Sequence, residues 1–176
     1  MKSISAILLL ATLLLGGCGE QTKQTTDQNT AKKVEISILE NYKHGAKELV
    51  QMIKQGQPDS EIAEKSAELV ANSKSIIKEF IVKHPKCTTY LNALNEAADL
   101  IPTLPLAEIE SGYHEDGKLP KFDDPNCYHA KDLLVHPATV QAMANMGISS
   151  NEMRESAEHE IIEVIAHFSQ VEKVLN

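Results

Sequence analysis

The sequence predicts an all-α domain like a four-helix bundle, with a long disulfide-pinned loop and one short extra helix. Apolar residues recur at three- and four-residue steps over several long segments, which is the spacing of amphipathic helices. No segment alternates apolar and polar residues as a half-buried strand does. An antiparallel bundle is the simplest way to bury several such stripes, because each helix covers those of its neighbours.

Two long helices are expected first. In residues 34–53 the apolar side chains follow helical steps, and Gly56 ends the helix. A second helix starts after Pro58 and runs to about Lys83, because His84 precedes a proline and is disfavoured in the helical region.

The next segments predict a third helix and then a long loop. Residues 88–100 form the third long helix, which Pro102 ends. Residues 103–136 contain several prolines and glycines, and we expect them to form an ordered loop. A short helix then starts with Pro137 at its first position and ends near Met146.

A final long helix follows a serine cap at Ser149 or Ser150. Its apolar residues form one stripe at alternating four- and three-residue steps: Ala157, Ile161, Val164, Phe168, Val171 and Leu175. The predicted domain therefore covers residues 34–176.

Residues 1–17 have the features of a signal peptide. Lys2 precedes an apolar run that is about half the length of a membrane span, and the run ends in Leu15-Gly16-Gly17-Cys18. This motif resembles the lipobox of bacterial lipoproteins. The resemblance implies that the chain is cut before Cys18 and that the thiol and new amino group of this residue carry lipid.

The resemblance also implies a location. In the lipoproteins of two-membrane cells, an Asp after the lipidated Cys tends to retain the protein in the inner membrane. This chain has Gly19 there, which favours the outer membrane, facing the periplasm. We expect residues 18–33 to consist of the acylated cysteine and a disordered tether that follows it. After Gly19, Ala31 is the only apolar residue in this segment, so the segment has little with which to pack.

The other two cysteines, Cys87 and Cys127, predict a disulfide, since a lipoprotein domain lies in an oxidising compartment. Closing a loop of about 40 residues would stabilise the fold by roughly 4 kcal/mol. Two free thiols or a metal site are the alternatives. There is no CxxC motif that would support a thioredoxin-like redox role.

Composition excludes some partners. The net charge is −8, Arg154 is the sole arginine and no basic stripe is present, so nucleic-acid binding is not expected. An acidic body is also not drawn to an anionic membrane surface. Lipid on Cys18 is therefore the expected membrane attachment.

Imidazole and carboxylate groups in the predicted loop form a candidate metal site. His114, Asp116, His129 and His136 are of the ligand types that suit Zn²⁺, Cu²⁺ or Fe. The alternative is a solvated acidic loop held by prolines and a disulfide, with His136 helping to cap a helix.

The final helix carries further polar residues: Glu155, His159, Glu160, Glu163 and His167. All of them except Glu160 fall in pairs at i,i+4 spacing. The segment starting at His159 looks like HExxH, but Glu163 replaces the second histidine, so the zincin motif fails. Pairing on the helix surface is the favoured interpretation.

Haem is a further alternative. CxxCH is absent, which excludes covalent c-type attachment. A b-type haem needs axial ligands on facing helices, and His44, Met52 and His167 are available.

Two functions from different classes remain. No catalytic motif such as GxSxG is present, so no enzyme is expected. The first hypothesis is a non-catalytic envelope lipoprotein that binds another envelope protein or assists assembly. The alternative is a metal- or haem-binding helical module of the cell envelope.

Overall fold

The computed structural model describes the backbone from Gln28 and the side chains from Ile38 to the C-terminus. Within these residues every regular element is helical, as the sequence predicts. The elements are α1 (Gln28–Lys54), α2 (Asp59–Lys83), η1 (Pro85–Cys87), α3 (Thr88–Ala97), η2 (Ile101–Thr103), α4 (Leu106–Ile109), η3 (Glu110–His114), α5 (Pro125–Met146) and α6 (Asn151–Leu175). The predicted signal peptide and Cys18 lie outside the described residues.

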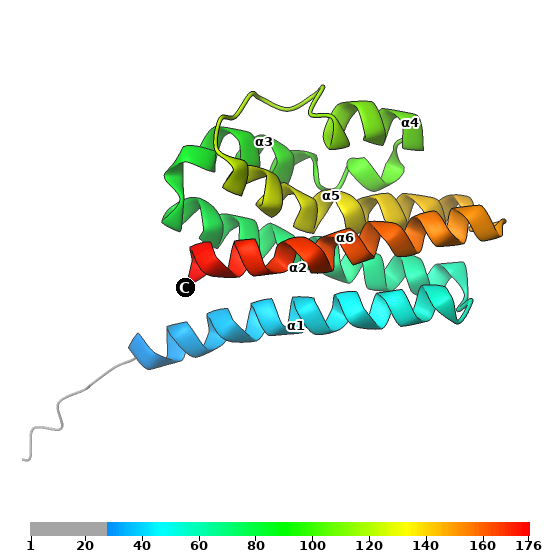
Figure 1. Cartoon of the computed structure of the whole chain (residues 1–176), viewed down its shortest axis with the longest axis horizontal. Helices are drawn as coiled ribbons and strands as arrows, with labels where there is room; N and C mark the ends of the chain where they lie inside the picture. The colour runs from blue at the N-terminus through cyan, green and yellow to red at the C-terminus, as the bar shows by residue number, and fades with distance from the viewer. Residues whose placement is uncertain (1–27) are drawn as a thin grey trace, which may run out of the picture.

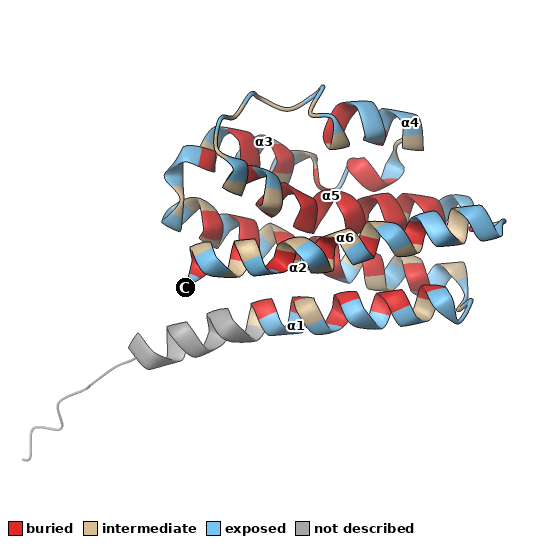
Figure 2. Ribbon diagram, in the orientation of Figure 1, coloured by how far each residue is buried: buried red, intermediate tan, exposed pale blue. Residues whose placement is uncertain are grey.

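Helices α1, α2, α5 and α6 form an antiparallel four-helix bundle (Figure 1). Short turns join α1 to α2 and α5 to α6, and the Cys87–Cys127 disulfide holds the end of α2 near the start of α5. The Lys83 side chain donates a hydrogen bond to the carbonyl of Leu175, so α6 ends where α2 ends. The buried residues line the inside of this bundle (Figure 2).

Helix α5 is the most buried element. It packs against α2 and α6 of the bundle, while α3, η2 and α4 contact it from outside (Figures 1 and 2). Nearly all its residues from Ala130 to Ala144 are therefore buried. Because all sides of α5 are covered, its polar residues are buried too, and they need partners from neighbouring elements.

The start of α5 corrects the sequence prediction. The structure begins this helix at Pro125, so the prediction of a loop up to residue 136 and a helix starting at Pro137 was wrong. The third long bundle helix is accordingly α5, rather than residues 88–100. Asp124 is the cap, since its side chain accepts a hydrogen bond from the backbone N–H of Asn126 at 3.0 Å.

Pro137 is tolerated inside α5 because another helix supplies the missing donor. A proline has no N–H, so the carbonyl of Leu133 has no partner four residues later. The hydroxyl of Tyr42, a fully buried residue of α1, donates to this carbonyl at 2.6 Å. A tertiary hydrogen bond thus replaces the lost helical one.

The N-terminal boundary also differs from the prediction. Helix α1 begins at Gln28, whereas the sequence predicted a disordered tether over residues 18–33. Residues 28–33 contain no Gly or Pro, and Ala31 with the two lysines after it favours helix. Adding residues to an existing helix costs far less than nucleating a new one.

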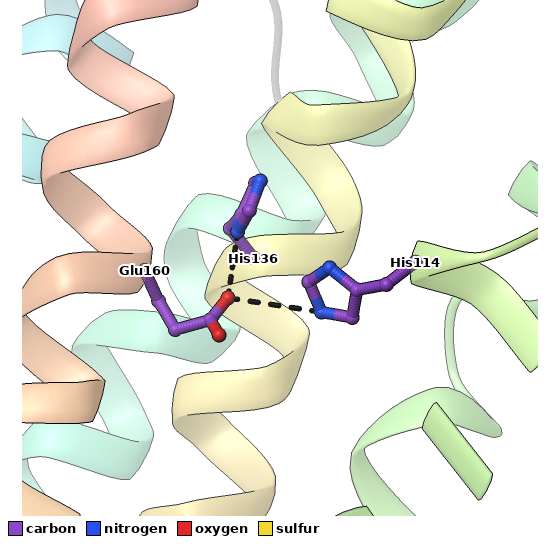
Figure 3. Close-up of side chains that lie close together, drawn as sticks. All are labelled: His114, His136 and Glu160. Carbon is purple, nitrogen blue, oxygen red and sulfur yellow. Dashed lines mark hydrogen bonds and ion pairs between the residues drawn. The ribbon is translucent and has the colours of Figure 1, made fainter. Parts of the chain in front are cut away.

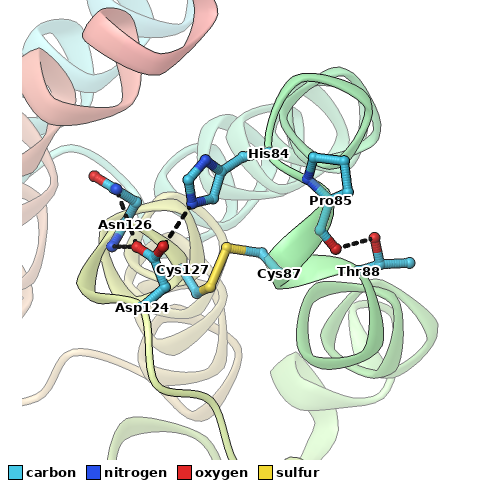
Figure 4. The surroundings of a disulfide bond; sticks show 7 residues. All are labelled: His84, Pro85, Cys87, Thr88, Asp124, Asn126 and Cys127. Carbon is cyan, nitrogen blue, oxygen red and sulfur yellow. Dashed lines mark hydrogen bonds and ion pairs between the residues drawn. A yellow bond between two sulfur atoms is a disulfide. The ribbon is translucent and has the colours of Figure 1, made fainter.

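The predicted disulfide is confirmed (Figure 4). It joins Cys87 at the end of η1 to Cys127 in the first turn of α5, across a sequence separation of 40 residues. Beside it, His84 Nε2 lies 2.9 Å from the Asp124 carboxylate. Both links fix the start of α5, the helix that carries His129 and Asp132. Among the described helices, none is long and apolar enough to cross a membrane.

Candidate metal centre

A polar cluster lies in the otherwise apolar interface between α5 and α6. Each helix supplies three side chains at three- and four-residue steps, which places them on one helical face. A seventh side chain comes from η3, a short π-helical segment. The residues are His129, Asp132 and His136 of α5; Glu160, Glu163 and His167 of α6; and His114 of η3.

Two imidazoles converge on one carboxylate at His114, His136 and Glu160, which we call the first triad (Figure 3). Glu160 Oε2 lies 2.6 Å from His136 Nδ1 and 3.7 Å from His114 Nε2. The two imidazole rings have centroids 5.0 Å apart. One ligand atom from each residue lies within 4.8 Å of the other two. A metal ion bound to His114 Nε2 would replace its 2.9 Å hydrogen bond to Thr139.

The first triad is buried enough to perturb its histidines. Burial alone would lower the pKa of His136, but the hydrogen bond that His136 donates to Glu160 and the carboxylate charges around it raise this pKa overall. Burial lowers the pKa of His114, and the charge of Glu160 opposes the effect. His114 is therefore held as a neutral imidazole, which is the form that binds metals.

Three further residues, His129, Asp132 and His167, form the second triad. The buried carboxylate of Asp132 accepts a hydrogen bond from His167 Nδ1. The rings of His129 and His167 have centroids 5.0 Å apart, with planes at 84°. Burial raises the pKa of Asp132, against the charges of His136, Lys131 and His167.

The two triads are continuous with each other through Asp132 and His136. The Nε2 atom of His136 lies 3.7 Å from Asp132 Oδ1 and 3.6 Å from Glu163 Oε2. His136 therefore presents one nitrogen to Glu160 and the other to these two carboxylates. Asp132 presents one oxygen to His136 and the other to His167.

A buried lysine holds the segment that carries His114. Lys131 is 1% exposed, and its ammonium group donates to the His114 carbonyl at 2.8 Å and to Asp116 at 3.1 Å. The Tyr90 hydroxyl donates to the same Asp116 oxygen at 2.6 Å. We call Lys131, Asp116 and Tyr90 the clamp. Asp116, predicted as a metal ligand, lies in the clamp and in neither triad.

The polar pairs of α6 divide into two groups. His159 has a side chain that is 71% exposed and lies 3.4 Å from Glu163, which matches the predicted surface pairing. Glu160 and His167 instead face α5, so the surface interpretation was wrong for them. Glu155 is exposed.

The haem ligands considered from the sequence are not gathered in one place. His44 is exposed and lines a polar groove between α1 and α2, together with Lys65. Met52 packs against the apolar core, and His167 belongs to the second triad.

The arrangement supplies two sets of two imidazoles and one carboxylate. Sets of this kind bind Zn²⁺ in several enzymes and Fe²⁺ in non-haem oxygenases. Sequence reasoning identified His114, His136 and His129 as candidates and missed Asp132. The signal was the three- and four-residue spacing of His129, Asp132 and His136, which is informative only if residues 125–136 are helical. No family model, curated protein or solved structure compared with the chain matches it.

Proposed function

We propose that this protein is a helical module that binds a divalent first-row transition metal at the first triad. The observation that carries the proposal is the convergence of His114, His136 and Glu160 from three separate elements (Figure 3). The three side chains are far apart in the sequence, so their meeting depends on the fold. The burial of His136 further limits competition from water.

The ligand chemistry favours a transition metal over calcium or magnesium. Ca²⁺ and Mg²⁺ bind oxygen ligands, whereas imidazole suits Zn²⁺, Cu²⁺, Fe²⁺ and Ni²⁺. The first triad offers two imidazole nitrogens and one carboxylate oxygen. Three protein ligands with room for a further exogenous one are typical of metal sites that exchange ligands.

The charge of the surroundings also favours a cation. Asp132, Glu160 and Glu163 bring three carboxylates to one short stretch of the α5–α6 interface. With neutral imidazoles the cluster is anionic, and the ammonium group of Lys131 is already paired with Asp116. A divalent ion would offset part of this negative charge.

The lipobox-like motif supports a location of the proposed metal module at the cell envelope. Lipid on Cys18 would hold it at the outer membrane, facing the periplasm, where metal ions arrive from outside the cell. This lipidation is part of the proposal and is supported by the sequence motif alone. An envelope protein partner and the absence of catalysis stay predictions from the sequence.

Metal analysis of the full-length protein tests the proposal. The protein is extracted in detergent without a histidine tag, stripped with a chelator and titrated with Zn²⁺ against a fluorescent indicator. We expect tight binding at the first triad, and we expect this binding to weaken at least tenfold in His136→Ala and in Glu160→Gln. His159→Ala removes an exposed histidine from the same helix and is the matched control.

Circular dichroism of each variant shows whether it is folded, so that lost binding is not confused with lost structure. Wild-type protein that binds no Zn²⁺, Cu²⁺, Fe²⁺ or Ni²⁺ more tightly than Glu160→Gln does would overturn the proposal. The cluster would then be a network of ion pairs that holds α5 against α6.

A further inference from the structure

We infer that the second triad is a second metal site, so that α5 and α6 hold a pair of metal ions. This inference rests on the proposed function and extends it from one ion to two. The second triad repeats the composition of the first, with two imidazoles and one carboxylate. One ligand atom each of His129, Asp132 and His167 lies within 4.8 Å of the other two.

An unpaired imidazole nitrogen supports this site independently. His129 Nδ1 is buried, and within the described residues it has no hydrogen-bond partner. A buried polar atom without a partner is costly, so native proteins rarely leave one unsatisfied. A metal ion is a partner that such a nitrogen can take.

The carboxylate of Asp132 is positioned to bind a metal ion in the second triad. It is 1% exposed, and one of its oxygens lies against His167. The ring of Tyr128 lies beside the triad, with its centroid 5.6 Å from that of His167. The site is therefore enclosed on one side by an aromatic ring and anchored by a carboxylate that water hardly reaches.

Asp132 also connects the second triad to the first. Histidines that bind metals usually give their other ring nitrogen to a carboxylate, which fixes the ring. His136 Nδ1 faces Glu160, and its Nε2 faces Asp132 Oδ1 at 3.7 Å. Asp132 is thus a ligand of the second ion and an orienting partner for a ligand of the first.

This connection predicts that the two ions weaken each other's binding. An ion in the second triad places positive charge on Asp132 and draws its carboxylate away from His136. Coupling between sites is reciprocal and is typically 5- to 150-fold in affinity. We therefore compare two affinities for Zn²⁺. The first triad should bind its ion more tightly, by about this factor, when the second triad is empty than when the second triad is occupied.

Equilibrium dialysis of the full-length protein against Zn²⁺ tests the inference. We expect two ions per wild-type chain at saturation, one in His129→Ala and one in His114→Ala. The single ion retained by His129→Ala should bind more tightly than the second ion of the wild type. His159→Ala should keep both ions.

The possible results separate this inference from the proposed function. One ion per wild-type chain that is retained in His129→Ala and lost in His114→Ala would overturn the second site and leave the first. One ion that both variants lose would also overturn the inference, since the triads would then form a single site. No ion in any variant would overturn the proposed function itself.

Discussion

Tyr42 is the residue that allows a proline in the most buried helix. Its hydroxyl donates to the carbonyl that Pro137 leaves unpaired, and burial raises the pKa of Tyr42 well above its ordinary value, so the proton stays on. Tyr42→Phe removes the donor and leaves the Leu133 carbonyl buried without a partner. We expect the free energy of unfolding to fall by about 1–3 kcal/mol in urea denaturation.

A second substitution shows whether the carbonyl is the cause. Pro137→Ala restores an N–H four residues after Leu133, so the helix itself satisfies the carbonyl. In a Pro137→Ala background, Tyr42→Phe should cost less than it does in the wild type. An equal cost in both backgrounds would show that the Leu133 carbonyl is not the cause of the loss.

Lys131 is the residue that fixes His114 to α5. Lys131→Met removes a buried ammonium group, leaves the His114 carbonyl without this donor and leaves Asp116 with the Tyr90 hydroxyl but no cation. We expect a loss of stability on the order of 3 kcal/mol, because an uncompensated charge remains in a partly buried place. Chemical denaturation measures the loss.

Lys118→Met is the matched control for Lys131→Met. Lys118 lies 3.1 Å from Glu108, and both side chains are about half exposed. A surface ion pair of this kind contributes less than about 1 kcal/mol. If the two lysine variants destabilised the protein equally, the clamp would have no special role.

At the scale of elements, the start of α5 depends on a charged cap. Hydrogen bonds from the Asn126 backbone and from His84 hold the pKa of Asp124 below its ordinary value (Figure 4). A carboxyl with a lowered pKa in the folded state stabilises the protein above its unfolded pKa of about 3.9. That stability disappears as the pH falls through the lowered folded value.

Asp124→Asn should therefore lower stability at neutral pH, and stability should depend less on pH below about pH 4 than in the wild type. Asparagine still caps a helix, so the variant removes the charge and keeps most of the cap. Urea denaturation as a function of pH provides the measurement. Asp123→Asn, at an exposed neighbouring position, is the matched control.

The bounds of α5 show which part of the fold the sequence determines locally. Amphipathic spacing predicted α2 and α6, because one face of each helix is buried and the other is exposed to solvent. Helix α5 is covered on all sides and has no such contrast. Helix α5 starts with one proline, Pro125, and contains a second, Pro137. Because proline favours the first position of a helix, the local sequence allows a helix to start at either residue. The donor that decides between them, Tyr42, is distant in sequence.

The same reason limited the prediction of the site. Three histidines of the two triads were candidates because of their chemistry alone. Asp132 and the inward direction of Glu160 follow only once α5 is known to run beside α6. Asp116 has suitable chemistry for a ligand, but its left-handed backbone at φ 62° and its bonds to Tyr90 and Lys131 place it in the clamp.

At the scale of the whole molecule, two contacts join the turns at one end of the bundle. Asp59 accepts a hydrogen bond from the Ile148 N–H at 3.1 Å, and Arg154 donates to the Ile53 carbonyl at 3.0 Å. Near the other end, the disulfide holds the start of α5, and the hydrogen bond from Lys83 to the Leu175 carbonyl holds the end of α6. Helices α5 and α6 are thus held at both ends of the seam that contains the triads, which limits how far the metal ligands can separate.

The proposed membrane attachment concerns the entire chain. If Cys18 carries the lipid, Cys18→Ala should leave an uncut precursor that is not modified by a labelled fatty acid. Metabolic labelling and the migration of the protein on a gel would show both effects. A variant that still matures and takes up label would contradict the lipobox assignment. Cys87→Ser tests a cysteine inside the domain and should still be labelled.

The central claim is that a metal ion binds between α5, α6 and η3, and anomalous X-ray diffraction from Zn²⁺-loaded crystals tests it most directly. Data collected on both sides of the zinc absorption edge locate the ion without assumptions about ligands. We predict an anomalous peak about 2.0–2.2 Å from both His136 Nδ1 and a Glu160 carboxylate oxygen. Peaks confined to exposed histidines such as His44 and His159, with His136 still bonded to Glu160, would contradict the claim.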